Sequence, residues 1–344
     1  MTTNPPMAES AAPHVPNETM RAWAQQRYGG PETVEPVRVP VPTPGPADLL
    51  LRVRACGIHA GDARLMRGDP ALVRLAFGIR RPRTATRGID VAGTVVAMGA
   101  AVTGFRIGDE VVAEIGVGGG LAEYAIIPAA RAVSRPARIS PAVAAALPVS
   151  GGTAWQALDA AGVHSGSRVL VIGASGGVGT YTVQLAAERG AEVWALAGER
   201  ALGLVTGLGA AHTFDYRQVQ PGAPELPPAS FDAVIDIAGT APLATLRGLL
   251  REGGTVVLVS GAGGKILGPM GRMLKAAFLS RRRRRIRSLA ATARPEILAQ
   301  LLELTDRGSI RPVIERTYSL DAARDALAHV DAGHAVGKVV VAVE

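Results

Sequence analysis

Apolar and polar positions follow different periods along the chain, and the change of period marks its parts. Between residues 150 and 280, short apolar runs of strand length alternate with stretches whose apolar residues recur at helical spacing. The predicted strands are residues 168–172, 192–196, 212–214, 231–237 and 255–259. Short strands that alternate with helices predict a parallel β-sheet covered by helices on both faces.

The segments on either side follow other patterns. From residue 20 to about 147, valine-rich pieces are bounded by Gly and Pro turns, which is typical of a β-rich unit. From residue 288 the predicted order is helix, strand, helix, strand, and residues 337–343 form the last strand. Residues 1–19 are rich in Pro, Ala and Asn and predict a flexible tail.

Composition narrows the possible classes of protein. The 344 residues are 48% hydrophobic, which is enough to bury a sizeable core in about two domains. Cys56 is the only cysteine, which excludes a disulfide within the chain and every cysteine-rich metal site. No apolar run approaches the ~20 residues that span a bilayer, and the N-terminus does not resemble a secretory signal. We therefore expect a cytoplasmic protein.

The net charge of +8 comes from one part of the chain. Residues 253–295 contain no acid, and they hold a run of five arginines, Arg281 to Arg285. The simplest interpretation is a solvated loop or helix end; contact with a membrane surface or with nucleic acid are the alternatives. Because the chain has only three Trp, five Tyr and five Phe, few rings could stack on bases. We expect a small-molecule substrate and no nucleic-acid partner.

A glycine-rich turn lies between the first predicted strand of the middle region and the helix after it. Residues 172–179 read I-G-A-S-G-G-V-G, and the three positions of a G-x-G-x-x-G fingerprint fall on Ala174, Gly176 and Gly179. Such a turn lets backbone approach a diphosphate at the N-terminus of a helix. We expect the diphosphate of a dinucleotide to be bound by Ser175, Gly176, Gly177, Val178 and Gly179.

The end of the second strand bears on the choice between NAD and NADP. An acid there would bind the ribose 2′-hydroxyl, whereas a cation would accept a 2′-phosphate. The sequence places Gly198, Glu199 and Arg200 at this point. We expect Arg200 to bind a 2′-phosphate and the cofactor to be NADP(H). The alternative is a solvated pair of charges at the start of a helix.

Several further motifs surround this turn and occur in a fixed order. They are RAW at 21–23, YGGPE at 28–32, CGIHAGD at 56–62, GIDVAG at 88–93, VTGFRIGD at 102–109, GTAW at 152–155, QLA at 184–186, LGA at 208–210, IRPVI at 310–314 and GKVV at 337–340. In this order they resemble the medium-chain dehydrogenase/reductase superfamily, specifically its zinc-independent quinone oxidoreductase-like branch.

The resemblance implies an α/β architecture in which a doubly wound Rossmann domain is inserted in a GroES-like β domain. The GroES-like catalytic domain would comprise residues 20–148 and 288–344, and the NADP-binding Rossmann domain residues 149–287. It also implies a homodimer that uses NADPH to reduce quinones or other activated carbonyl or alkene substrates, such as enones. Two alternatives stay open: an alcohol dehydrogenase with an atypical zinc site, and a non-catalytic NADPH-binding redox sensor.

The motifs argue against a catalytic zinc ion. In the alcohol dehydrogenase branch, a cysteine ligand stands three residues before the Asp that corresponds to Asp62, and a Gly-His-Glu motif supplies the next ligand. Here His59 and Ile89 occupy those positions, and an isoleucine cannot bind a metal. A makeshift site from His59, Asp62 and Asp90 is the remaining possibility, and we expect no metal.

The resemblance also suggests residues of the reaction site. His59 is expected near the nicotinamide, where it would donate a hydrogen bond or a proton to the substrate oxygen; a purely structural histidine is the alternative. Asp62 is expected at the same site as a catalytic residue; the alternative is that it orients the loop. Cofactor contacts are expected from Thr153, Gly198, Arg200, Tyr216, Ala238, Gly239, Val259 and Ser260. These positions trace the carboxyl edge of the predicted sheet, where open α/β folds bind ligands.

Overall fold

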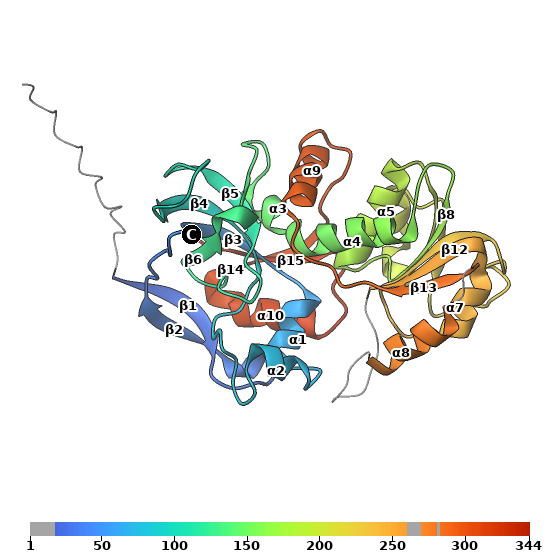
Figure 1. Ribbon diagram of the computed structural model, residues 1–344, viewed down its shortest axis with the longest axis horizontal. Helices are drawn as coiled ribbons and strands as arrows, with labels where there is room; N and C mark the ends of the chain where they lie inside the picture. The colour runs from blue at the N-terminus through green and yellow to red at the C-terminus, as the bar shows by residue number, and fades with distance from the viewer. Residues whose placement is uncertain (1–17, 260–269, 281–282) are drawn as a thin grey trace, which may run out of the picture.

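The structure is a computed structural model that describes residues 18–259, 270–280 and 283–344. Figure 1 shows two β-rich domains at opposite ends of the long axis of the molecule, joined through a layer of helices. No helix in these ranges is both long enough and apolar enough to cross a membrane.

A six-stranded parallel sheet forms the domain at the right of Figure 1. Its strand order is β10-β9-β8-β11-β12-β13. The strands are β8 (Arg168–Ile172), β9 (Glu192–Ala197), β10 (His212–Asp215), β11 (Phe231–Asp236), β12 (Leu250–Leu258) and β13 (Arg285–Ser288). The order along the sheet reverses between β8 and β11, which is where doubly wound sheets bind ligands. The predicted parallel sheet is confirmed, and β12 begins earlier than the predicted strand at residue 255.

Helices cover this sheet, and its core is apolar. They are α5 (Gly177–Glu188), α6 (Leu202–Gly207), α7 (Leu243–Leu249) and α8 (Met270–Leu279). The helix α4 (Pro148–Ala161) enters the domain and packs against α5 and against α9 (Pro295–Asp306). Tyr181 of α5 is fully buried there, and its hydroxyl donates a hydrogen bond to Ala146 O at 3.0 Å.

The described part of the arginine run lies between the end of α8 and the edge strand β13. Arg281 and Arg282 lie outside the described residues. Arg283 is exposed and pairs with Glu252 at 3.1 Å, and Arg285 already belongs to the edge strand β13. In β13 the buried Ile286 alternates with exposed arginines, so the strand packs one side chain inward and keeps its charges in solvent.

The second domain contains a seven-stranded sheet. Its order is β14-β15-β3-β4-β5-β7, and β6 also pairs with β3. The strands are β3 (Asp48–Ile58), β4 (Asp90–Met98), β5 (Glu110–Glu114), β6 (Tyr124–Pro128), β7 (Val133–Ser134), β14 (Ile314–Ser319) and β15 (Lys338–Ala342). Because β14 and β15 come after the parallel sheet in the chain, the C-terminal segment returns to the first domain, as the resemblance implied.

Smaller elements complete this domain. Its three helices before residue 147 were not predicted, because that region was expected to be β-rich. A separate hairpin is formed by β1 (Thr19–Gln25) and β2 (Val34–Pro40). Thr19 pairs with Pro40, so the expected tail at 1–19 extends too far; residues 1–17 lie outside the described part. The helices of this domain are α1 (Ala60–Arg67), α2 (Val73–Phe77), α3 (Pro141–Ala145) and α10 (Ala323–Asp331).

The two domains are hydrogen-bonded at the glycine-rich turn. Gly337, just before β15, donates its backbone N–H to Ser175 O at 2.8 Å, and a parallel bridge joins Gly337 to Gly176. Gly337 has a φ of 74°, and a Cβ there would lie 2.3 Å from Val313 O. Only glycine fits this crossing without displacing the backbone. The turn therefore faces the catalytic domain directly.

Candidate active site

The glycine-rich turn has the geometry of a diphosphate cradle. After β8 the chain turns at Gly173, whose φ is 87°, and α5 begins after the extended N-cap Gly176. A Cβ on Gly179 would lie 2.2 Å from Gly173 O, so the third glycine lets the helix start pack on the turn. The first N–H groups of α5 have no partner within the helix and can donate to an anion.

Two cavities meet at this turn. One has a volume of about 630 Å³ and the other of about 340 Å³, and both are lined by Gly176, Ile237, Gly333 and Ala335. They therefore form a continuous groove that passes over the turn, between the parallel sheet and the segment before β15. The size range is that of ordinary ligand sites, which are roughly 300–1,000 Å³.

The larger cavity gathers the residues expected around the adenosine end of a cofactor. Ser175, Gly198, Arg200, Tyr216 and Ala238 all line it. The exposed Arg200 donates from Nη2 to His334 O at 2.5 Å. Arg217, which the sequence analysis missed, lines the same cavity, and its guanidinium stands 5.3 Å from the centre of the Tyr216 ring. Arg217 directly follows Tyr216 in the sequence, and this adjacency was the signal that could have indicated its place in the cavity.

The smaller cavity gathers the residues expected around the nicotinamide. His59, Thr153, Gly177, Val178 and Val259 line it together with Lys338. Gly239 is not among the lining residues of either cavity; its N–H donates to Asp236 Oδ1 at 2.9 Å and shapes the turn after β11. Ser260 lies outside the described residues.

Asp236 is the partner of Arg272, one of the arginines in the acid-free segment 253–295. Its carboxylate is fully buried at the end of β11 and accepts a hydrogen bond from Arg272 Nη2 of α8 at 2.5 Å. Burial raises the pKa of Asp236, and the Gly239 hydrogen bond and Arg272 oppose that rise. Arg272 thus has a structural role that the sequence pattern did not indicate.

His59 is held by the start of α1. It is the N-cap residue, and its Nδ1 accepts a hydrogen bond from Gly61 N at 2.9 Å. Burial lowers the pKa of His59 to about 4, against the opposing charge of Asp62. The ring is therefore neutral near pH 7. Since Nδ1 accepts, the single proton is on Nε2.

The Nε2–H group of His59 is a buried hydrogen-bond donor that is left unused. It has no hydrogen-bond partner among the residues that the structure describes. Asp62 Oδ2 lies 3.4 Å away without forming a hydrogen bond. Buried donors normally have partners. Because His59 lines the smaller cavity, its unused N–H is a candidate donor to a ligand oxygen there.

Asp62 acts on His59 from behind. Its Oδ2 accepts a hydrogen bond from His59 N at 3.1 Å, which closes the capping box of α1. The side chain is 1% exposed and is not among the residues lining the two cavities. This carboxylate contacts the backbone of His59 and does not line either cavity, so its placement suits positioning of the histidine and not contact with a reactant.

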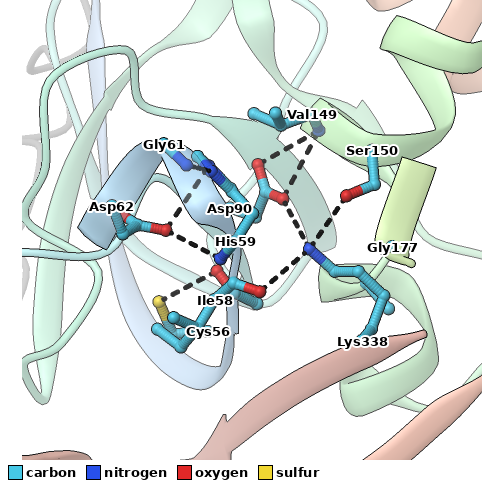
Figure 2. A network of polar contacts seen from close by, with 12 residues as sticks. Cys56, Ile58, His59, Gly61, Asp62, Asp90, Val149, Ser150, Gly177 and Lys338 are labelled. Carbon is cyan, nitrogen blue, oxygen red and sulfur yellow. Dashed lines mark hydrogen bonds and ion pairs between the residues drawn. The ribbon is translucent and has the colours of Figure 1, made fainter. Parts of the chain in front are cut away.

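Lys338 was not expected at the site, because its GKVV motif was used only as a final strand and as one of the family motifs. Its Nζ donates to Ile58 O and Ser150 Oγ, each at 3.2 Å, and lies 3.7 Å from Asp90 Oδ2. Figure 2 shows these groups converging beside His59. Burial raises the pKa of Asp90, and Lys338 opposes this rise. One of only three lysines, placed directly after a glycine, was the signal available.

A catalytic zinc site is not assembled from these side chains. Over 18–259, 270–280 and 283–344, no three His, Cys, Asp or Glu residues come together as metal ligands. Asp90 accepts a hydrogen bond from Val149 N at 3.2 Å and faces Lys338. Cys56 is buried, and burial raises the pKa of its thiol.

Comparison with known proteins identifies the family of this chain. Two family models match: an alcohol dehydrogenase GroES-like domain over residues 45–137, and a zinc-binding dehydrogenase over residues 208–341. The chain is 35% identical over 336 residues to the chloroplastic quinone-oxidoreductase QR1 of Triphysaria versicolor, covering 94% of this chain and 98% of that protein. The chain belongs to the medium-chain dehydrogenase/reductase superfamily.

The curated relatives within this superfamily include several proteins named quinone oxidoreductase and an alkenal/one oxidoreductase. This dehydrogenase/reductase is 29% identical to the chloroplastic NADPH-dependent alkenal/one oxidoreductase of Arabidopsis thaliana, over 95% of this chain and 80% of that one. The solved quinone oxidoreductase of Coxiella burnetii superposes with a TM-score of 0.85 at 28% identity, covering 95% of this chain and all of that chain. The protein is an oxidoreductase of the quinone oxidoreductase-like branch, and its Rossmann-type domain implies a nicotinamide cofactor.

Proposed function

We propose that this dehydrogenase/reductase uses NADPH to reduce quinones or enones by hydride transfer. The observation that carries the proposal is the pair of cavities that meet over the glycine-rich turn. The larger cavity has Arg200 and Arg217 at its wall beside Tyr216, and the smaller has His59 among largely apolar residues, so we assign the first to a phosphorylated nucleoside and the second to an oxygen-bearing acceptor. The names of the relatives support the same class of substrate.

The larger cavity fits a 2′-phosphorylated adenosine. Arg200 and Arg217 offer planar guanidinium groups, which bind phosphate oxygens in pairs, and the Tyr216 ring offers a stacking face. Glu199 also lines this cavity and would repel a phosphate, but the two arginines outnumber it. The balance of charge favours NADPH over NADH.

The smaller cavity would orient the hydride donor and the acceptor and limit their contact with water. When bound, the dihydronicotinamide supplies the hydride. Ile58, Val178 and Val259 give the cavity apolar walls, which limit the access of water to the acceptor. Thr153 and the backbone of Gly177 fix the position of the ring beside these walls. Holding donor and acceptor in contact supplies up to about 7–11 kcal/mol of the barrier reduction.

His59 stabilises charge and keeps its proton. Reduction of an enone or a quinone places negative charge on the oxygen of the acceptor. The Nε2–H group of the neutral imidazole donates a hydrogen bond to that oxygen. With a pKa near 4 the ring holds no second proton near pH 7, so the proton that completes the product comes from solvent.

Turnover with a panel of quinones and enones tests the proposal. We expect NADPH oxidation that depends on the acceptor, measured by absorbance and by product analysis. In His59→Leu we expect kcat/KM to fall roughly 100-fold, as for loss of one oxyanion donor. In His59→Asn, which keeps an N–H donor and an N-cap, we expect a smaller loss. NADPH binding without turnover on any acceptor would favour a redox sensor instead.

A further inference from the structure

Arg87 is a buried cation that forms no ion pair with a carboxylate of the described residues. It precedes β4, and its residue is only 4% exposed. Its Nη2 donates to Thr84 O, but its buried Nε has no hydrogen-bond partner among the described residues. No carboxylate of the described chain lies within ion-pair distance of it. A buried charge without a partner is costly, so this arrangement needs an explanation.

Two other poorly exposed arginines of the molecule show the usual solution. Arg135, whose side chain is 8% exposed, pairs with Glu110, and Arg272, at 13%, pairs with Asp236. All three have a buried Nε without a partner among the described residues, but Arg87 alone of the three lacks a carboxylate partner there. Asp62 is the carboxylate that acts on it most strongly, but Asp62 is bound to the start of α1 beside His59. Burial therefore lowers the pKa of Arg87.

Arg87 lines a cavity of about 210 Å³. The walls are largely apolar or aromatic, with Tyr28, Leu65, Phe77 and Val117 among them, and Arg83 adds a second cation. Leu65 lies on α1 next to Arg64, which lines the smaller cavity of the redox groove. The two cavities share no lining residue, so the helix α1 separates them.

The walls of this cavity are held in place by hydrogen bonds. Arg87 O accepts from Leu121 N at 2.9 Å and from Gly119 N at 3.3 Å, which fixes the backbone of the buried arginine. Tyr28 donates from its hydroxyl to Gly78 O at 2.6 Å. Arg83 N donates to Phe77 O at 2.8 Å. The cation is therefore presented by a preformed frame and not by a loose surface side chain.

The surroundings define the kind of ligand. Residues 70–89 contain five arginines and no acid. Leu75 and Ile79, close in the chain to Phe77 of the cavity wall, are 61% and 68% exposed. We propose that the cavity binds an oxyanion, a carboxylate or a phosphate, carried on a small apolar body, at a site distinct from the redox groove. The oxyanion would supply the charge that Arg87 lacks, and the apolar body would cover the exposed side chains.

Calorimetric titration with simple amphiphiles tests this proposal. The probes are octanoate, octyl phosphate, inorganic phosphate and the neutral octanol, each added to the full chain saturated with NADP⁺ so that phosphate sites of the groove are filled. We expect one or both amphiphilic anions to bind, inorganic phosphate to bind more weakly, and octanol not to bind. Comparison of the two amphiphiles distinguishes carboxylate from phosphate.

Matched variants assign the binding to this cavity. Arg87→Met should weaken the anions at least tenfold, Arg83→Met about threefold, and the exposed control Arg138→Met not at all. Circular dichroism checks that each variant folds, and Arg83→Met keeps the test available should Arg87→Met fail to fold. No anion binding by the wild-type chain, or equal binding by wild type and both cavity variants, would overturn the proposal. The readout does not depend on NADPH turnover.

Discussion

The Nζ atom of Lys338 lies 3.7 Å from Oδ2 of Asp90, and the two side chains are 1% and 0% exposed. The lysine comes from β15 and the aspartate from β4, and two of the other groups that they bind, Ser150 and Val149, belong to α4. This buried pair therefore joins the catalytic domain to the helix that carries Thr153. It holds the two sides of the smaller cavity together (Figure 2).

Removing one partner of this pair should cost more stability than removing both. Lys338→Met leaves the buried Asp90 carboxylate unpaired, which costs about 3–5 kcal/mol. The double variant Lys338→Met with Asp90→Asn keeps an acceptor for Val149 N and should recover most of this loss. Urea unfolding measures the free energies, and the exposed Lys275→Met is the control. Equal losses in the single and double variants would contradict a coupled pair.

The third glycine of the turn gives a sharp steric test. In Gly179→Ala, a Cβ would lie 2.2 Å from Gly173 O, so the start of α5 must move and cofactor binding should fall at least tenfold. Gly203 of α6 is the matched control because a Cβ there meets nothing within 4 Å. Gly203→Ala should leave binding unchanged and stabilise the fold by about 0.5–1 kcal/mol. Fluorescence titration with NADPH measures the affinity of both variants. Similar affinities of the two variants would argue against a close-packed cradle.

The parts of the fold that sequence predicted best are those encoded locally. The strand β8, the turn at Gly173 and the helix α5 follow one another in the chain, so hydrophobic period and glycine spacing describe them together. The edge strand β13 was missed for the opposite reason. Its sequence is dominated by arginines, and it forms because its backbone pairs with β12 and Ile286 packs inward. That pairing partner lies outside any local window.

The polar contacts of the site show the same division. His59 and Thr153 were expected from motifs, but the role of Lys338 depends on Asp90 and Ile58, which lie far away in the chain. Similarly, Arg87 is unusual because no carboxylate of the described residues lies within ion-pair distance of it, and a sequence pattern does not show which neighbours are absent. Burial and pairing over long separations decide what these charged residues do.

Cofactor choice should depend on the cations of the larger cavity. Arg200→Gln removes a charged donor to a 2′-phosphate, and a hydrogen bond to a charged group contributes about 1.5–3 kcal/mol. We therefore expect KM for NADPH to rise roughly 10-fold to 150-fold. The KM for NADH should change little, because NADH has no 2′-phosphate. Steady-state kinetics with both nucleotides measures this; parallel changes would mean that Arg200 acts through its bond to His334 O.

The buried His59 should make the folded protein sensitive to acid. Its pKa is about 4 in the folded chain, against 6.5 for an ordinary histidine. Between these two values the unfolded chain binds a proton and the folded chain does not, so acid favours unfolding. The contribution of His59 to the free energy of unfolding is complete above pH 6.5 and falls as the pH approaches 4. The full loss corresponds to about 3 kcal/mol.

His59→Asn isolates this contribution, since asparagine also caps helices and does not titrate. We expect the wild-type free energy of unfolding to fall more steeply than that of the variant between pH 6.5 and 4, with a difference that approaches about 3 kcal/mol. Buried Asp90 titrates in both proteins and cancels in the comparison. Urea unfolding at a series of pH values measures the two curves. Parallel curves would show that the imidazole takes up its proton in the folded state as readily as in the unfolded chain, and a neutral donor facing the acceptor would then be the wrong description of the site.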